Sequence, residues 1–374
     1  MKVLITGADG FIGKNLQLAL SPCQEVEVRC FDRSHTSQQL VEMLEGVEFV
    51  FHLAGVNRPH DPAEFASGNT DLTAVLCQAL AVQAAAGIRI PVVYTSSSQA
   101  AQSNPYGESK RGAEELLFDL KRQHDVPVYV LRLPNVFGKW SRPNYNSVVA
   151  TFCHNIARDL PIMVNNPDAP VSLVYVDDVV QRFIQLMDGA APCMDTEGFE
   201  QVQPVYATTV GQLADTINGF RGNRDTLMID RVGTGLTRAL YATYVSYLPP
   251  EQFSYTVPMH GDARGVFVEM LKTQDSGQFS YFTAHPGVTR GGHYHHTKTE
   301  KFLVIKGQAV FRFRHMQTGD YHELYTDGQK AEVVETVPGW THDITNVGQD
   351  EMVVMLWANE VFDRERPDTY ACPL

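Results

Sequence analysis

The sequence predicts an α/β domain built on a doubly wound parallel sheet, followed by an all-β domain of the jelly-roll type. Over roughly the first 245 residues, short apolar runs alternate with segments whose leucines recur every four residues, as strands alternating with helices do. Beyond about residue 259, β-rich runs are divided only by glycine-containing turns, which is typical of a sandwich or jelly roll.

Length and composition are those of two globular domains. The chain has 374 residues, of which 44% are hydrophobic and 20% charged. A formal charge of −13 argues against a nucleic-acid partner, and no apolar run approaches the roughly 18 residues of a membrane span. The six cysteines show no paired spacing, as in reduced proteins. We expect a cytoplasmic protein with domains at 1–245 and 259–374, joined by a linker or interdomain strand at 246–258.

The chain opens with a strand, a glycine turn and a helix. The apolar residues 3–5 precede Gly7, Gly10 and Gly13, and a helical pattern follows. Such glycines permit close backbone approach, and the N–H groups that begin the helix can hold a pyrophosphate. The alternative is a purely structural turn, because this motif alone is weak evidence. The predicted dinucleotide contacts in this turn are Gly7, Gly10, Phe11, Ile12 and Gly13.

Two further strand ends are expected to contact the same dinucleotide. The second strand ends in Asp32 and Arg33. An acidic residue there binds the ribose hydroxyls, whereas an arginine accommodates a 2′-phosphate. We choose Arg33 and therefore NADPH, with NADH and a solvated charged pair as the alternatives. The third strand, residues 49–52, runs into Leu53, Ala54 and Gly55 at the same edge of the sheet.

A tyrosine and a lysine four residues apart predict chemistry at a carbonyl. Pro105 can open a helix, which places Tyr106 and Lys110 on one face. The ammonium is expected to lower the phenol pKa from its usual value of about 10. A serine cluster at 96–98 follows a strand just upstream. With the glycine turn, this set favours ketone reduction over an incidental surface pair.

These motifs resemble the extended short-chain dehydrogenase/reductase family, whose Rossmann-like members act on nucleotide sugars. Residues 131–138 and 174–179 carry the resemblance further. It implies that Ser97, chosen over Ser96, polarises the carbonyl, that Tyr106 donates the proton, and that Lys110 holds the cofactor ribose. Asn135 lies where relatives contact the sugar nucleotide, and Asn146 is expected to line the substrate subdomain. The alternative for both asparagines is a plain loop role.

Histidine is concentrated in the last third of the chain, and four residues there have metal-ligand spacing. In a strand His293 and His295 would share a face while His296 points away. Glu300 adds an oxygen ligand and His342 a third nitrogen. This set suits zinc, or less selectively iron, manganese or nickel. The alternative is a group of hydrogen-bonded histidines without metal.

The same region resembles the two motifs of the cupin family, with Pro338 displaced by one position. Residues 262–269 and 290–294, with Lys301, also resemble the sugar-nucleotide 3,5-epimerases, which are metal-free cupins. That likeness implies that Arg264 and Glu269 hold the nucleotide and that Lys301 stabilises an enolate. This chain has His295 where those enzymes have glutamine, which favours a metal. Lys301 or an uncoordinated group is then left to move the proton.

The order of the two domains resembles the bifunctional CapF/WbjC-type enzymes of capsule and O-antigen synthesis, with the match carried by residues 137–147 and 293–302. The resemblance implies C3 epimerisation of a UDP-2-acetamido-2,6-dideoxy-4-hexulose. NADPH-dependent reduction to UDP-N-acetyl-6-deoxy-L-talosamine, a precursor of N-acetyl-L-fucosamine, would follow. It also implies a homodimer. The alternatives are a reductase whose all-β domain only dimerises, and a nucleotide-sugar sensor without turnover.

Overall fold

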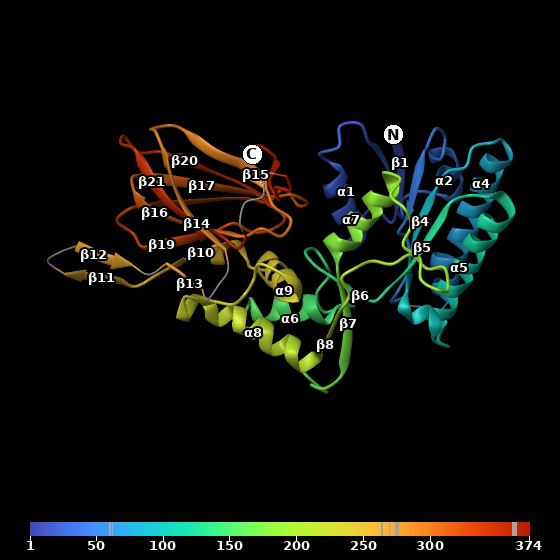
Figure 1. Cartoon of the computed structure of the whole chain (residues 1–374), viewed down its shortest axis with the longest axis horizontal. Coiled ribbons are helices and arrows are strands. Elements are labelled where there is room, and N and C mark those ends of the chain that lie inside the picture. Colours follow the sequence, from blue (N-terminus) through green and yellow to red (C-terminus); the bar gives the residue numbers. More distant parts are fainter. Residues whose placement is uncertain (60, 62, 263–264, 269, 274–276, 361–364) are drawn as a thin grey trace. The chain divides into compact units, whose positions relative to one another are not determined.

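The computed structural model describes the whole chain except residues 60, 62, 263–264, 269, 274–276 and 361–364 (Figure 1). Its contacts divide it into two compact units. The first comprises Met1–Val136 and Ser172–Ala207, and the second comprises Phe137–Val171 and Thr208–Leu374. No helix within the described residues has both the length and the apolar character needed to cross a bilayer.

The first unit is built on a parallel sheet of five strands in the order β2-β1-β3-β4-β5. Both faces of the sheet are covered, so its central strands are apolar throughout, and Val3, Leu4 and Ile5 are fully buried. The strand order reverses direction at β1 and β3, where open α/β sheets bind ligands. The strands are β1 (Lys2–Thr6), β2 (Glu27–Phe31), β3 (Phe49–His52), β4 (Val92–Ser97) and β5 (Val128–Leu133).

Helices cover the two faces of this sheet. In Figure 1, α1 and α7 lie on one face and α4 and α5 on the other. Leu76 and Leu117 pack from α4 and α5 into the same core as Leu4 and Val92. The helices are α1 (Phe11–Leu20), α2 (Ser37–Met43), α3 (Ala63–Phe65), η1 (Ala66–Asp71), α4 (Leu72–Ala85), η2 (Ser98–Ala101), α5 (Pro105–His124) and α7 (Val176–Met187).

The predicted start of the helix that carries Tyr106 is confirmed. Pro105 occupies the first turn of α5, where its missing N–H costs nothing. The Asn104 side chain caps the helix by accepting a hydrogen bond from the Gly107 N–H at 2.8 Å. The division between the units falls within three short strands that pair with one another, β6 (Asn135–Phe137), β7 (Pro170–Tyr175) and β8 (Tyr206–Thr209).

The second unit contains two antiparallel five-stranded sheets, with the orders β10-β19-β16-β21-β14 and β18-β17-β20-β15-β22. Aromatic rings from both sheets meet in the interior, where Phe302 and Phe311 have centroids 5.6 Å apart. The first sheet comprises β10 (Ser254–Thr256), β14 (Gln278–Ala284), β16 (Glu300–Lys306), β19 (Glu332–Glu335) and β21 (Met352–Ala358). The second comprises β15 (Thr289–Tyr294), β17 (Gln308–His315), β18 (Tyr321–Asp327), β20 (Trp340–Asn346) and β22 (Tyr370–Ala371).

Helices and short strands complete the second unit. A parallel pair is formed by β9 and β13, and a hairpin by β11 and β12. Residues 254–256, within the segment predicted to link the domains, form the edge strand β10 of the first sheet. The predicted fold class is confirmed. These elements are α6 (Val148–Ile156), α8 (Val210–Thr226), β9 (Met228–Ile229), α9 (Gly235–Ser246), η3 (Pro250–Gln252), β11 (Met259–Asp262), β12 (Gly265–Val268) and β13 (Lys272–Thr273).

Candidate functional site

The glycine turn after β1 leaves no room for side chains. Gly7 has φ +69°, and its N–H donates to the Phe31 carbonyl at 2.9 Å. A Cβ on Gly13 would lie 2.4 Å from the Gly7 carbonyl oxygen. Helix α1 begins at Phe11 with no side-chain cap within the described residues, so its first amides keep donors for an anion. The turn therefore fits the phosphates of a dinucleotide.

Replacing Gly13 by alanine is expected to weaken dinucleotide binding at least about tenfold, because the new Cβ would force the turn open. NADPH titration followed by nicotinamide fluorescence measures this change. Gly222→Ala is a matched control, since Gly222 is also helical but has no atom within 4 Å of its added Cβ. An unchanged dissociation constant in the Gly13 variant would contradict the assignment of this turn.

The ends of β2 and β3 lie beside this turn in the sheet. Arg33 is exposed just beyond β2, while the Asp32 carboxylate accepts hydrogen bonds from Ser34 and His35. After β3 the Ala54 N–H donates to the Thr6 hydroxyl at 3.2 Å. Leu53, the residue before Ala54, is held against the end of β1 in the same way, because its N–H donates to the Thr6 carbonyl. The residues predicted to contact the dinucleotide after β1 and after β3 are thus adjacent in the structure.

Gly55 joins the glycine-rich edge of the sheet to Lys110. A Cβ on Gly55 would lie 3.0 Å from the Lys110 ammonium and 2.9 Å from the Asn69 amide oxygen. Asn69 is buried on the π-helix η1, where its Nδ2 donates to the Ser109 hydroxyl at 2.9 Å. Sequence reasoning missed Asn69, and the only local signal is its place at the start of a helix.

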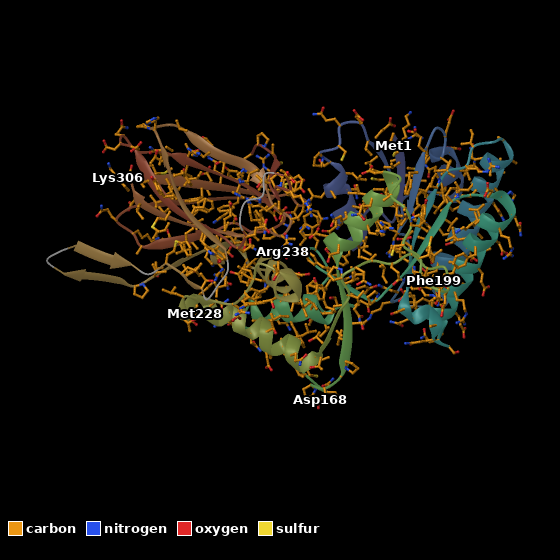
Figure 2. The ribbon with its side chains drawn as sticks, in the orientation of Figure 1. Met1, Asp168, Phe199, Met228, Arg238 and Lys306 are labelled. Carbon is orange, nitrogen blue, oxygen red and sulfur yellow. The ribbon has the colours of Figure 1, made fainter. Side chains whose placement is uncertain are left out.

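Tyr106 and Ser97 are brought together at the end of β4. The Ser97 side chain lies close enough to the Tyr106 phenol to oppose, in part, the rise in the pKa of Tyr106 that burial causes. Ser96, the alternative serine, instead donates to the Glu114 carboxylate, which also accepts two hydrogen bonds from Arg132. The geometry therefore favours Ser97 as the partner of the phenol. The Arg132 guanidinium also packs 3.8 Å from the ring centre of Phe199 (Figure 2).

The structure corrects the expected electrostatics of the Tyr106–Lys110 pair. Burial raises the pKa of Tyr106 above its usual value, and the nearby Ser97 side chain only partly opposes this. Burial also lowers the pKa of Lys110 to about 8, against the pull of Glu114. The Lys110 ammonium donates to the Thr95 carbonyl at 2.9 Å and lies 4.9 Å from the Tyr94 ring centre. Lys110 therefore does not lower the phenol pKa as predicted.

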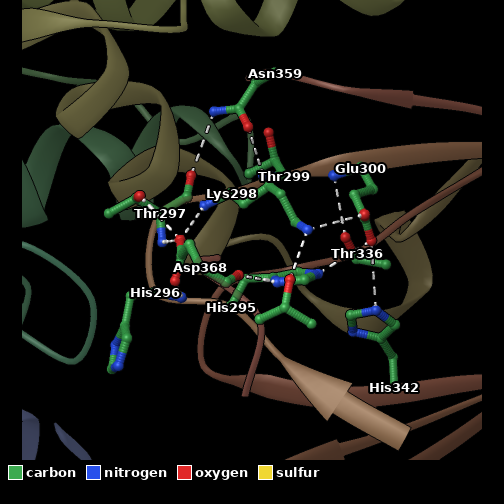
Figure 3. Close-up of polar contacts among 11 residues, drawn as sticks. His295, His296, Thr297, Lys298, Thr299, Glu300, Thr336, His342, Asn359 and Asp368 are labelled. Atoms are coloured by element: carbon green, nitrogen blue, oxygen red, sulfur yellow. Dashed lines mark hydrogen bonds and ion pairs between the residues drawn. The ribbon is translucent and has the colours of Figure 1, made fainter. Parts of the chain in front are cut away.

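The second candidate site joins the four predicted metal ligands. One ligand atom from each of His293, His295, Glu300 and His342 lies within 4.8 Å of the others. Three of the four residues are buried, and His293 is partly exposed. His295 does not belong to a strand as predicted, because β15 ends at Tyr294. It reaches the cluster from the turn that follows, with His296 pointing away (Figure 3).

The charge state of this cluster suits a cation. Burial, together with His342 and His295, lowers the pKa of His293 to about 3. Burial lowers the pKa of His342 as well. Burial alone would raise the pKa of Glu300, but the charge and hydrogen bond of His295 hold it well below its usual range. Neutral imidazoles at His293 and His342 beside an ionised Glu300 are forms that bind metal.

Two acceptor atoms face each other across the cluster. His295 Nδ1 can only donate to the Asp368 main-chain carbonyl oxygen, which leaves the neutral ring with a lone pair on Nε2. That Nε2 lies 3.1 Å from Glu300 Oε2. Neither ring nitrogen of the buried His342 has a hydrogen-bond partner within the described part of the chain. A divalent cation would satisfy the two facing acceptor atoms and one ring nitrogen of His342; the alternative is a doubly protonated His295 paired with Glu300.

Lys301 is not brought to this cluster. Neighbouring residues of a strand point to opposite faces, so Glu300 faces the histidines and Lys301 the other side of β16. The Lys301 ammonium there bonds Glu335 and donates to the Tyr255 hydroxyl at 3.3 Å. Arg224 from α8 contacts the same Glu335. This geometry favours a structural role for Lys301, and its predicted catalytic role remains a prediction.

The predicted substrate residues are distributed between the units. Asn135 belongs to the first unit, where its amide donates to the Ser172 carbonyl at 3.1 Å. Asn146 is exposed just before α6 in the second unit. Arg264 and Glu269 lie outside the described residues. The role of all four residues in substrate binding remains a prediction.

Comparisons with known proteins match both parts of the chain. Residues 3–192 match the NAD dependent epimerase/dehydratase family, and residues 260–370 match the polysaccharide biosynthesis C-terminal domain. A UDP-2-acetamido-2,6-beta-L-arabino-hexul-4-ose reductase from Pseudomonas aeruginosa is 61% identical, over 100% of this chain and 98% of the relative. The crystal structure of the capsular polysaccharide assembling protein CapF from Staphylococcus aureus is similar over the full length of both chains, with 39% identity and a TM-score of 0.66.

The chain belongs to the CapF-type family of NAD dependent epimerases/dehydratases. Similarity outside this family is partial. An Arabidopsis thaliana UDP-glucuronic acid decarboxylase is 27% identical over 58% of this chain and 73% of the relative.

Proposed function

We propose that this chain is a bifunctional UDP-sugar enzyme of surface-polysaccharide synthesis. In its second domain a UDP-2-acetamido-2,6-dideoxy-4-hexulose is epimerised at C3. In its first domain the C4 ketone is reduced with NADPH to UDP-N-acetyl-6-deoxy-L-talosamine, on the route to N-acetyl-L-fucosamine. The observation that most supports the proposal is the 61% identity, over the whole chain, to a UDP-hexulose reductase. The position of Ser97 at the end of β4 beside Tyr106, with Lys110 one turn further along α5, supports the chemistry. We also propose a homodimer, which light scattering on the purified protein would test.

The reduction uses groups of the first unit in separate roles. When bound, the nicotinamide supplies the hydride that attacks C4. Tyr106 would give its phenolic proton to the oxygen that develops negative charge, and Ser97 would donate a hydrogen bond to the same oxygen. The raised pKa of Tyr106 keeps the phenol protonated before the reaction, which suits a proton donor. Lys110, fixed by the Thr95 carbonyl, would contact the cofactor ribose.

Epimerisation depends on the same ketone. The C4 carbonyl acidifies the hydrogen at C3, so the hydrogen can be removed and returned from the opposite face. A divalent cation, for which zinc is the first choice, would stabilise the resulting negative charge when held by the four ligands. The Lys298 ammonium lies 3.5 Å from Glu300 Oε1 and adds positive charge at the same place. Reduction at C4 then removes the acidifying carbonyl and fixes the configuration at C3.

A second candidate function keeps only the reduction and gives the cluster a structural role. The burial of His295, Glu300 and His342 favours it, because structural metal sites are closed and catalytic sites keep an open position. The partly exposed His293 is the one ligand that offers an approach to a substrate.

Replacing His342 by alanine decides between these functions. The variant and the wild type are incubated with the UDP-4-keto sugar in heavy water without NADPH, and the C3 proton is followed by NMR. We expect exchange in the wild type and a decrease of at least about 100-fold in the variant, because the ligand set is broken. NADPH added together with the C3-epimerised ketone should still be oxidised by the variant, since the first unit is untouched.

His285→Ala is the matched control, because this histidine of the same domain is exposed. Its C3 exchange should equal that of the wild type. Thermal melting of each variant separates loss of exchange from loss of the fold. Unchanged exchange in the His342 variant would favour the structural cluster, and an absence of both exchange and NADPH oxidation in the wild type would favour a sensor.

A further inference from the structure

Residues 368–372 run alongside the four-ligand cluster and pair with the strand that leads to it. Ala371 and Tyr370 pair with His293 and Tyr294 in the register of β22 and β15. The Cys372 N–H donates to the Gly292 carbonyl at 2.7 Å. The segment thus adds an edge strand directly beside His293.

The Asp368 carboxylate organises the turn between the ligands His295 and Glu300. It accepts hydrogen bonds from three successive backbone N–H groups, those of His296 at 2.9 Å and of Thr297 and Lys298 at 2.7 Å each (Figure 3). The Thr297 hydroxyl donates to the same carboxylate at 3.0 Å. Successive N–H groups that converge on one anion form a nest, which fixes the backbone around it. The position of His295 relative to Glu300 therefore depends on a carboxylate outside the cluster.

The same segment reaches two further neighbours of the ligands. The Thr369 hydroxyl accepts a hydrogen bond at 2.8 Å from the Lys298 ammonium, which lies beside Glu300. The Cys372 carbonyl accepts one from the hydroxyl of Thr341, the residue before His342. His293 and His295 therefore contact this segment directly. Glu300 and His342 each lie next to a residue that is hydrogen-bonded to the segment.

We propose that Asp368 is a positioning residue of the cation site, and that docking of residues 368–372 and binding of a divalent cation stabilise each other. The Asp368 main-chain carbonyl holds the proton of His295 on Nδ1, so that Nε2 offers its lone pair to the cluster. Its carboxylate fixes the turn that carries this histidine. This inference rests on the proposed function, in which the four ligands hold such a cation.

Coupling between the segment and the cation is reciprocal by thermodynamic necessity. If the docked segment tightens cation binding, the bound cation must stabilise docking by the same factor. Two properties of the segment can then be measured. One is its effect on cation affinity, and the other is the protection of its own amides from hydrogen exchange when the cation binds. Neither is a measurement of enzyme activity.

The test measures zinc binding by wild-type protein and by the Asp368→Asn and Asp368→Ala variants. Zinc affinity is obtained by competition with a fluorescent chelator, and its release rate by transfer to excess chelator. Because partners of ligands typically change metal affinity by about 10–100-fold, we expect that loss in Asp368→Ala and a smaller one in Asp368→Asn. Asp320→Asn is the control, since this exposed turn carboxylate belongs to the same domain but bonds only within its own turn.

A second measurement uses unmodified protein and so does not depend on how the variants fold. Hydrogen–deuterium exchange of the amides at 368–372 is compared with and without added zinc. We expect slower exchange with zinc, including at the Cys372 N–H. Equal exchange with and without bound zinc would overturn the coupling.

The outcomes separate this inference from the function beneath it. Wild-type protein that takes up no divalent cation would show that the cation site itself is wrong. Wild-type protein that binds zinc, with folded Asp368 variants of equal affinity and release rate, would leave the cation site standing and overturn the role of Asp368.

Discussion

Replacing Tyr106 by phenylalanine is expected to slow reduction of the UDP-4-keto sugar by about 10²–10⁴-fold, the usual contribution of a positioned proton donor. The variant loses only the phenolic hydroxyl, and its ring can still pack on Phe65, whose ring centre lies 5.7 Å away. NADPH oxidation, followed by the absorbance of the reduced nicotinamide, measures the rate. C3 exchange in heavy water should persist, because it is assigned to the second domain.

Tyr129→Phe is the control for this prediction. Tyr129 lies near the amino end of β5, whereas the glycine turn and Ser97 lie at the carboxyl ends of their strands. Its rate of reduction should match that of the wild type. A Tyr106→Phe enzyme that reduces the ketone at the wild-type rate would remove the phenol from the mechanism and require another donor.

Replacing Glu335 by glutamine is expected to lower the free energy of unfolding of the second domain by about 3–5 kcal/mol, because it leaves the buried Lys301 and the partly buried Arg224 without a counter-ion. Lys301 and Arg224 both contact this carboxylate, and both Lys301 and Glu335 are buried. Burial alone would lower the pKa of Lys301, but Glu335 raises it above its usual value. Urea unfolding measures the loss, and the added change Lys301→Met should recover part of it.

The pH dependence of this effect has a defined sign. Burial alone would raise the pKa of Glu335, but Arg224 and Lys301 lower it below that of an unfolded glutamate, about 4.3. The stabilisation is therefore present above pH about 4.3 and is lost as the pH falls through the lower folded value. The difference between wild type and variant should shrink in acid. Glu323→Gln, at a surface carboxylate of β18, should differ by less than about 0.5 kcal/mol, and equal stability of the Glu335 variant would refute the assignment.

Local patterns were sufficient to predict the fold class and the four-ligand cluster. Alternating strands and helices predict a parallel sheet, because each crossover helix must cover one of its faces. The spacing of His293, His295, Glu300 and His342 predicts a shared site, and their ligand atoms lie within 4.8 Å of one another. The four residues converge from β15, the turn after it, the start of β16, and β20.

Long-range partners could not be predicted in the same way. Asp368 bonds His295 from 73 positions along the chain, and no motif marks it. The family resemblance favours Ser97 over Ser96, but the partner of Ser96, Glu114 in the middle of α5, has no signal in the sequence. The raised pKa of Tyr106 depends on burial, which spacing along a helix does not reveal. Each of these facts depends on tertiary packing.

The geometry of Lys301, by contrast, was within reach of the sequence. Glu300 was predicted as an inward ligand, and alternation along a strand then directs its neighbour to the other face. The family likeness outweighed this simple geometric rule. The structure places Lys301 beside Glu335, with Arg224 contacting the same carboxylate.

Glu300 and Lys301 point to opposite faces of β16 and make different contacts there. This arrangement restricts how the strand can change over evolution. Because side chains alternate with a period of two, a one-residue slip of β16 against its neighbours β19 and β21 would exchange the two faces. An ammonium would then enter the group of histidines, and a carboxylate would lose its place among them. Length variation among relatives should therefore be rare within β16 and in the turn before it, which Asp368 holds.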